Sequence, residues 1–117
     1  MSKNWVVHAR EDDVSRIHYN DQGLVPVIAQ DATTKAVLML AWADQEAIGR
    51  TLREGRVTYF SRSRQEYWRK GDTSGNIQVA HSLQVDCDGD VVLLLVDQTG
   101  PSCHTGANTC FGEGSAQ

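Results

Sequence analysis

Residues 77–96 read IQVAHSLQVDCDGDVVLLLV, and this stretch decides the fold class. Two long β-rich runs, 77–85 and 91–96, stand on either side of the dipeptide Asp88-Gly89. An Asp-Gly pair between two such runs is a strong signal for a tight hairpin turn. The sequence therefore predicts two long antiparallel strands joined near residue 88.

The residues before this hairpin predict shorter strands and one helix. Asp44 is a suitable N-cap and Gly55 a suitable C-terminal stop, so residues 44–54 are expected to be helical. Residues 70–76, KGDTSGN, have the composition of a loop. Strands are expected at 25–29, 36–40, 57–60 and 67–68, with Pro26 at a sheet edge or at a strand start. We expect an α+β fold, a mainly antiparallel β roll or pseudo-barrel with one clear helix.

Length, composition and charge narrow the class of protein. The chain has 117 residues, 40% of them hydrophobic, which suits a single domain over 1–117 with a polar lead-in at 1–16. No apolar run approaches the ~20 residues of a membrane span, and the N-terminus lacks a signal peptide's apolar stretch. We therefore expect a cytoplasmic protein without a membrane partner. The net charge of -4 argues against a nucleic-acid partner but allows a local cationic patch for a small phosphorylated ligand.

The three cysteines are an odd number and cannot all pair within the chain. Cys87 follows the first long strand, and Cys103 and Cys110 lie in a Gly-rich tail. Three thiolates with an open fourth position are typical of a catalytic zinc site. The alternative is that they are small buried hydrophobic residues, and the spacing alone leaves both possibilities open.

Three aspartates, Asp86, Asp88 and Asp90, alternate around Cys87. In an extended chain alternate side chains face the same way, so the carboxylates can converge while Cys87 points to the other face. Crowded carboxylates favour a cation among them, and oxygen ligands suit Mg²⁺ or Ca²⁺. The alternative is a polar hairpin end in which Asp and Gly serve only the turn.

Basic and hydroxyl-bearing residues gather in two nearby segments, 61–64 and 68–76. Arginine, lysine and hydroxyl groups beside flexible glycine backbone suit the binding of phosphate. A solvated basic loop would have the same composition, and no dinucleotide or Walker motif is present. The candidate phosphate ligands are Arg62, Arg64, Lys70, Thr73 and Ser74.

Together these signals resemble the phosphoribosyl-AMP cyclohydrolase family of histidine biosynthesis. The resemblance covers roughly residues 17–112 and rests on three ordered motifs: WRKGDTSGN at 68–76, DCDGD at 86–90 and GPSCHTGANTCF at 100–111. Residues 41–44, AWAD, depart from the family's usual pattern at the entry to the expected helix.

The resemblance implies a zinc- and magnesium-dependent homodimer. Its reaction adds water at C6 of the adenine ring of phosphoribosyl-AMP and breaks the N1–C6 bond. Zinc would be held by Cys87 of one subunit with Cys103 and Cys110 of the other. Magnesium would be held by Asp86, Asp88 and Asp90. The chain would carry this activity alone, without a fused pyrophosphohydrolase domain.

His104 stands next to a zinc ligand, and we hypothesise that it is the general base. Its alternative role is to support that ligand structurally. The basic and hydroxyl residues of 62–74 would then hold the two phosphoribosyl ends of the substrate. Two rival functions stay open: a structural zinc module that binds proteins, and a regulatory nucleotide-binding module without catalysis.

Overall fold

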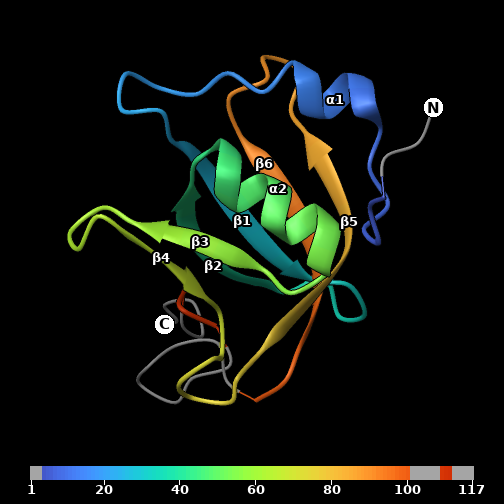
Figure 1. Cartoon of the computed structure of the whole chain (residues 1–117). Helices are drawn as coiled ribbons and strands as arrows, with labels where there is room; N and C mark the ends of the chain where they lie inside the picture. Colours follow the sequence, from blue (N-terminus) through green and yellow to red (C-terminus); the bar gives the residue numbers. More distant parts are fainter. Residues whose placement is uncertain (1–3, 101–108, 112–117) are drawn as a thin grey trace.

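A computed structural model describes residues 4–100 and 109–111 of the protein. Its strands form a four-stranded sheet in the order β2-β1-β6-β5 and a separate two-stranded ribbon, β3-β4 (Figure 1). The elements along the chain are α1 (Glu11–Ser15), β1 (Val25–Asp31), β2 (Val37–Ala43), α2 (Gln45–Glu54), β3 (Thr58–Ser61), β4 (Glu66–Arg69), β5 (Gln78–Val85) and β6 (Val92–Gln98).

The predicted hairpin is confirmed as the antiparallel pair β5–β6. Its turn contains Gly89, whose φ of 79° lies in the left-handed region that favours glycine. The pairing shifts register between Ala80 and Ser82, so His81 is an extra residue on β5. Such a bulge exchanges the two faces of the strand, because side chains alternate along it.

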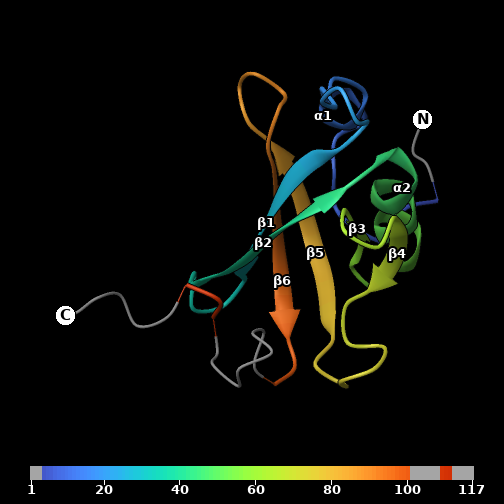
Figure 2. The same ribbon diagram turned by 90° about the vertical axis from the view of Figure 1, so that its left-hand side faces the viewer.

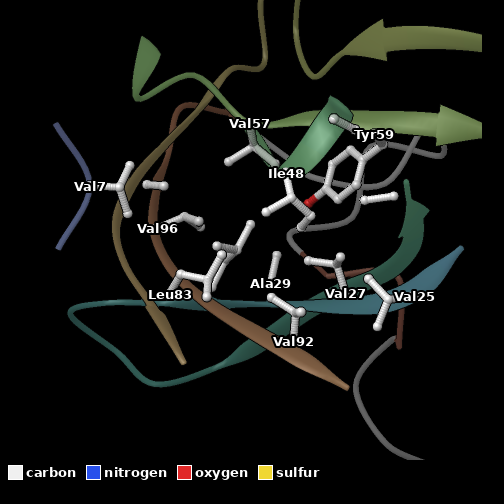
Figure 3. Close-up of a cluster of buried hydrophobic side chains, with 14 of the residues drawn as sticks. Val7, Val25, Val27, Ala29, Ile48, Val57, Tyr59, Leu83, Val92 and Val96 are labelled. Carbon is white, nitrogen blue, oxygen red and sulfur yellow. The ribbon is translucent and has the colours of Figure 1, made fainter. Parts of the chain in front are cut away.

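The predicted helix is confirmed as α2, with both predicted ends. The Asp44 carboxylate accepts a hydrogen bond from the backbone N–H of Ala47 at 2.9 Å, and Gly55 ends the helix with a φ of 81°. Ile48 and Leu52 are buried on its inner face. They pack into the same core cluster as Val27, Val57 and Tyr59 (Figure 3). Full burial of each such aliphatic side chain contributes about 1.5–3 kcal/mol.

The α+β class is confirmed, but the described strands do not close into a barrel. The sheet also holds one parallel pair, β1–β6, beside its antiparallel pairs. This pairing places β1 inside the sheet, so the edge position considered for Pro26 is wrong and the strand-start position is confirmed. Pro26 precedes Val27, the first residue paired with β6, and its missing N–H therefore removes no bond to that strand.

The two faces of the sheet differ. Figure 2 shows α2 and the β3-β4 ribbon on one side of the sheet and, among the described residues, no helix on the other. Ile28 pairs with Leu40 on β2 and with Leu93 on β6, and these three side chains share the second side. Leu40 is 46% exposed. A sheet face that is open to water is usually polar, so this apolar face is unusual.

Candidate active site

The turn that carries Cys87 is built by Asp86 and Gly89. One carboxylate oxygen of Asp86 accepts hydrogen bonds from the backbone N–H groups of Asp90 (3.0 Å) and Val91 (3.2 Å). The chain is therefore tightly turned at 87–89, and the alternation expected for an extended chain does not apply to Asp86, Asp88 and Asp90. Asp86 serves the turn geometry, as in the polar hairpin end considered from the sequence.

The two outer carboxyls of this turn interact electrostatically. The side-chain hydrogen bond to Asp86 and the negative charge of Asp86 raise the pKa of Asp90. Desolvation alone would raise the pKa of Asp86, but hydrogen bonds from the side chain and backbone of Asp90 outweigh it and lower that pKa. Within 4–100 and 109–111 of this single chain, no three His, Cys, Asp or Glu side chains form a group able to hold a metal ion.

The N-terminal segment supports this turn, which the sequence did not indicate. An Arg16 guanidinium nitrogen donates to the backbone carbonyl of Asp86 at 2.9 Å. The His18 N–H donates to the carbonyl of Gly89 at 2.6 Å. Residues 16–18 therefore fix the position of the turn, although neither contact follows any motif.

Cys87 and Cys110 are both exposed, and neither forms a disulfide. They lie near opposite ends of the sheet: Cys87 is in the β5–β6 turn, and residues 109–111 lie beside the far end of β2 (Figure 2). The Cys110 N–H donates to the Leu38 carbonyl at 2.7 Å, and the Thr109 hydroxyl donates to the same carbonyl at 3.1 Å. Cys103 and His104 lie outside the described residues.

The strand register gives the distance between the backbone at Cys87 and the backbone at Cys110. Val85, two residues before Cys87, stands level with Ala41 of β2 through the pairs across β6 and β1. Leu38, the partner of Cys110, is three residues from Ala41 along β2, away from the Cys87 turn, which is about 10 Å. Across the sheet, β2 lies two strand spacings from β6, which is again about 10 Å. The two backbone positions are thus roughly 14 Å or more apart. Sulfurs on one zinc ion lie within about 4.6 Å of each other, since each Zn–S bond is ~2.3 Å. One chain therefore cannot place Cys87 and Cys110 on the same ion.

The candidate phosphate ligands fall into two groups at opposite ends of the β3-β4 ribbon. Arg62 and Arg64 lie in the turn between the strands. The Arg62 guanidinium stacks 4.5 Å from the ring centroid of Trp42, and both residues line an open cavity of about 660 Å³ together with Phe60 and Trp68. Arg64 instead forms an exposed ion pair with Glu66 at 3.6 Å. Trp42 was not predicted as a site residue, although it stands in the segment that departs from the family pattern.

Lys70, Thr73 and Ser74 belong to the loop at the other end of this ribbon. Lys70 is mostly buried, and its backbone N–H donates to the Val57 carbonyl at 2.9 Å. Thr73 and Ser74 are exposed, and the Ser74 hydroxyl accepts from the Asn76 N–H at 3.1 Å.

Asp72 anchors the start of this loop by ion pairs with two arginines. The pairs are to Arg69 at 2.9 Å and to Arg56 at 3.1 Å. Neither arginine was singled out from the sequence.

A larger cavity, of about 1070 Å³, lies between the N-terminal segment and the start of α2. Trp5, Tyr19 and Asp44 are among its lining residues, and none of the candidate site residues that the structure describes lines it. Neither described helix has the length of a membrane span, since the longer one, α2, has ten residues.

The comparisons with known proteins agree with the chemistry of these residues. The chain is 57% identical over 101 residues to the phosphoribosyl-AMP cyclohydrolase of Leifsonia xyli, a match that covers 86% of this chain and 81% of the relative. It is 59% identical over 102 residues to that of Roseobacter denitrificans, covering 87% and 80%. Both relatives are named as cyclohydrolases, so the chain falls in a class of enzymes.

The family model for phosphoribosyl-AMP cyclohydrolase matches residues 39–112. The chain belongs to the phosphoribosyl-AMP cyclohydrolase family.

Proposed function

We propose that this chain hydrolyses the adenine ring of phosphoribosyl-AMP, the ring-opening step of histidine biosynthesis. Water would add at C6, the N1–C6 bond would break, N1 would take up a proton, and the water oxygen would become the carboxamide oxygen. The observation that carries this proposal is the identity of 57–59% over more than four-fifths of the chain to enzymes of that name. The reduced state expected for exposed thiols suits the cytoplasm, where we place the reaction.

The residues present fit a zinc ion held between two copies of the chain. Cys87 and Cys110 offer exposed thiols outside any disulfide, which is the donor type that zinc prefers. Because the strand register keeps these two thiols too far apart within one chain, a shared ion would take Cys87 from one subunit and Cys110, with Cys103, from the other. Zinc, when bound, supplies the Lewis acidity that makes water a stronger nucleophile at neutral pH. Asp86, Asp88 and Asp90, on the same turn as Cys87, offer the oxygen ligands that magnesium prefers.

The apolar second face of the sheet supports the homodimer. Ile28, Leu40 and Leu93 lie on the side of the sheet opposite α2. A second copy packed on this face would remove these side chains from water, at about 25 cal/mol for each Å² of apolar surface. The occupant we propose is the same chain, since a zinc ion shared by the separated thiols would need two copies.

The two groups of candidate phosphate ligands suit a substrate with two phosphorylated ends. Arg62 and Trp42 form a cationic and aromatic wall at one end of the β3-β4 ribbon, and Thr73 and Ser74 lie at the other end. The ribbon strands span four residues, about 13 Å. We assign one phosphoribosyl group to each end, with Arg64 and Lys70 adding positive charge.

His104 is the residue that we assign as general base. It would accept a proton from the attacking water and pass it toward N1 as the ring opens. Three thiolates lower the net charge of a zinc site and weaken its Lewis acidity, so a neighbouring base has more to contribute. His104→Ala is expected to lower kcat by about 10²-fold while zinc stays bound. Wild-type turnover across the pH range would contradict the assignment.

One assay separates this function from its rivals. Purified protein is incubated with phosphoribosyl-AMP, and the ultraviolet change on ring opening is followed with and without zinc. A zinc-dependent change supports the enzyme. A structural zinc module would bind zinc and produce no change, and a regulatory module would bind the nucleotide and leave it intact, so either result would refute the proposal.

A further inference from the structure

A chain of hydrogen bonds runs from the core to the loops at one end of the sheet. Gln78 is fully buried. The side-chain oxygen of Gln78 accepts a hydrogen bond from the Tyr59 hydroxyl at 2.7 Å. The side-chain nitrogen of Gln78 donates to the side-chain oxygen of Gln98 at 2.8 Å. The amide nitrogen of Gln98 then donates to the backbone carbonyls of Thr99 (3.0 Å) and Asn76 (3.2 Å).

The direction of every bond in this chain follows from its last step. The backbone carbonyls of Asn76 and Thr99 only accept hydrogen bonds, so the NH₂ group of Gln98 must face them. Its oxygen therefore faces Gln78, whose own NH₂ group must donate to it. The oxygen of Gln78 is left for Tyr59, which must be the donor.

A polar chain at a fully buried position is expensive unless every group is paired. Burying an unpaired amide costs about 1–3 kcal/mol, and an apolar side chain at the same place would carry no such cost. Gln78 has both amide hydrogens used, since its nitrogen also contacts the Met39 sulfur at 3.3 Å. What the polar chain supplies, and an apolar residue could not, is a donor to the Gln98 oxygen, which holds the amide with its NH₂ group toward the two carbonyls.

The two carbonyls that Gln98 holds belong to segments with candidate site residues. Asn76 ends the loop that carries Thr73 and Ser74. Thr99 is the last residue but one before the segment 101–108, which contains Cys103 and His104 in the sequence. A second contact joins the same two places, because the side-chain oxygen of Asn76 lies directly against Gly100.

We propose that Gln98, oriented by Gln78 and Tyr59, is a positioning residue that fixes the substrate loop at 70–76 relative to Thr99. This inference rests on the proposed function of that loop. Within the described residues, the side-chain hydrogen bonds of Gln98 go to Gln78, Asn76 and Thr99, and none goes to a candidate phosphate ligand. It acts by setting the distance between the end of β6 at Thr99 and the loop that carries Thr73 and Ser74.

The decisive variant is Gln98→Glu, which keeps the shape but places a carboxylate oxygen against two carbonyl oxygens. The KM for phosphoribosyl-AMP is expected to rise about tenfold, with zinc content unchanged, since small misplacements of binding groups cost factors of 10 to 10². Backbone amide exchange should accelerate in residues 70–76. Gln45→Glu, the same change at an exposed residue on α2, is the matched control and should change neither quantity.

A second variant keeps the test valid if Gln98→Glu fails to fold. The double substitution Tyr59→Phe with Gln78→Met replaces the buried polar groups by apolar groups of similar size, leaves Gln98 in place, and should raise KM by a smaller factor. Unchanged KM and amide exchange in the folded variants would overturn the proposal. If wild-type protein shows no ring opening but Gln98→Glu still accelerates exchange in the loop, the proposed function fails and the positioning role stands.

Discussion

The two ends of the four-stranded sheet are held in different ways. At one end, the turn with Cys87 is fixed by local groups: Asp86 accepts from the two backbone N–H groups that follow it, and Gly89 supplies the left-handed residue. At the other end, Gln98 joins segments 22 residues apart through a chain that begins in the core. The conformation of the first end is set by its own few residues and its position is held by Arg16 and His18, whereas the second end depends on a chain of side chains that begins in the core.

The largest expected effect is the loss of activity when the thiol at either end of the sheet is removed, and its recovery when the two variants are mixed. Cys87→Ser and Cys110→Ser are each expected to lose more than about 10³-fold in activity, because each would remove a proposed zinc ligand from every site. Mixing the two inactive variants after reversible dissociation should restore about a quarter of wild-type activity. Half of the dimers then contain both variants, and each of those has one of its two sites intact.

The measurement is the ring-opening assay on the refolded mixture. Mixing Cys87→Ser with itself, carried through the same procedure, is the control. Recovery in the mixture but not in the control would place the two thiols of one site on different chains. No recovery, with dimers shown by sedimentation, would mean that the site is not shared.

The next effect compares two glycines, one from each end. Gly89 and Gly100 both have positive φ, 79° and 72°. A methyl group on Gly89 would lie 2.5 Å from the backbone carbonyl oxygen of Arg16, whereas on Gly100 it would meet a side-chain atom of Asn76, which can move. Gly89→Ala is therefore expected to cost about 2–4 kcal/mol of unfolding free energy and Gly100→Ala about 1 kcal/mol.

Gly23→Ala is the matched control for the free-energy cost of placing a non-glycine residue at a positive φ. Its φ is 76°, and nothing lies within 4 Å of the added methyl group. Urea unfolding of the three variants separates the conformational cost from the steric one. Equal losses at Gly89 and Gly23 would show that the contact with Arg16 does not constrain the turn.

A smaller effect than that of Gly89→Ala is expected at the buried end of the polar chain. Tyr59→Phe leaves the Gln78 oxygen without its donor and should cost about 1–2 kcal/mol at pH 7. Burial, and then the charge of Cys110, raise the pKa of Tyr59 above its ordinary value of 10. A raised phenol pKa gives stability that is present below pH 10 and is lost as the pH rises further.

The difference between wild type and Tyr59→Phe should therefore shrink above pH 10, because only the wild type must ionise a buried phenol on alkaline unfolding. Chemical unfolding at pH 7, 9, 10 and 11 measures this difference. Tyr67→Phe is a partial control, since Tyr67 donates to Asp44 at 2.7 Å and is much less buried. A constant difference across this range would contradict the buried-donor assignment of Tyr59.

Elements set by neighbouring residues could be predicted from the sequence, and contacts between distant residues could not. Asp44, Gly55 and the Asp88-Gly89 pair act on neighbouring residues, so the sequence alone located α2 and the β5–β6 hairpin. The parallel pair β1–β6 joins residues about 65 positions apart in the chain, and no periodicity encodes it. The residue types for zinc and magnesium were visible, but the separation of Cys87 from Cys110 needed the strand register.

Gln78 escaped prediction for a different reason. Val79, His81, Leu83 and Val85 alternate in the sequence, which would place Val79 in the core and Gln78 in water. The extra residue at His81 exchanges the faces, so Val79 is 37% exposed and Gln78 is fully buried. The pattern of hydrophobic residues was correct after the bulge, where Leu83 is buried, and wrong before it.

That bulge gives β5 one residue more than its pairing with β6 uses. Deleting His81 would join Ala80 to Ser82 and leave every other pair between the two strands in place, so Gln78 would stay opposite Gln98 on the buried face. Losing a second residue between Gln78 and Leu83 would turn the Gln78 amide to the opposite face, and Gln98 would lose its orienting partner. This strand can therefore shorten by one residue without rebuilding this end of the domain, but not by two.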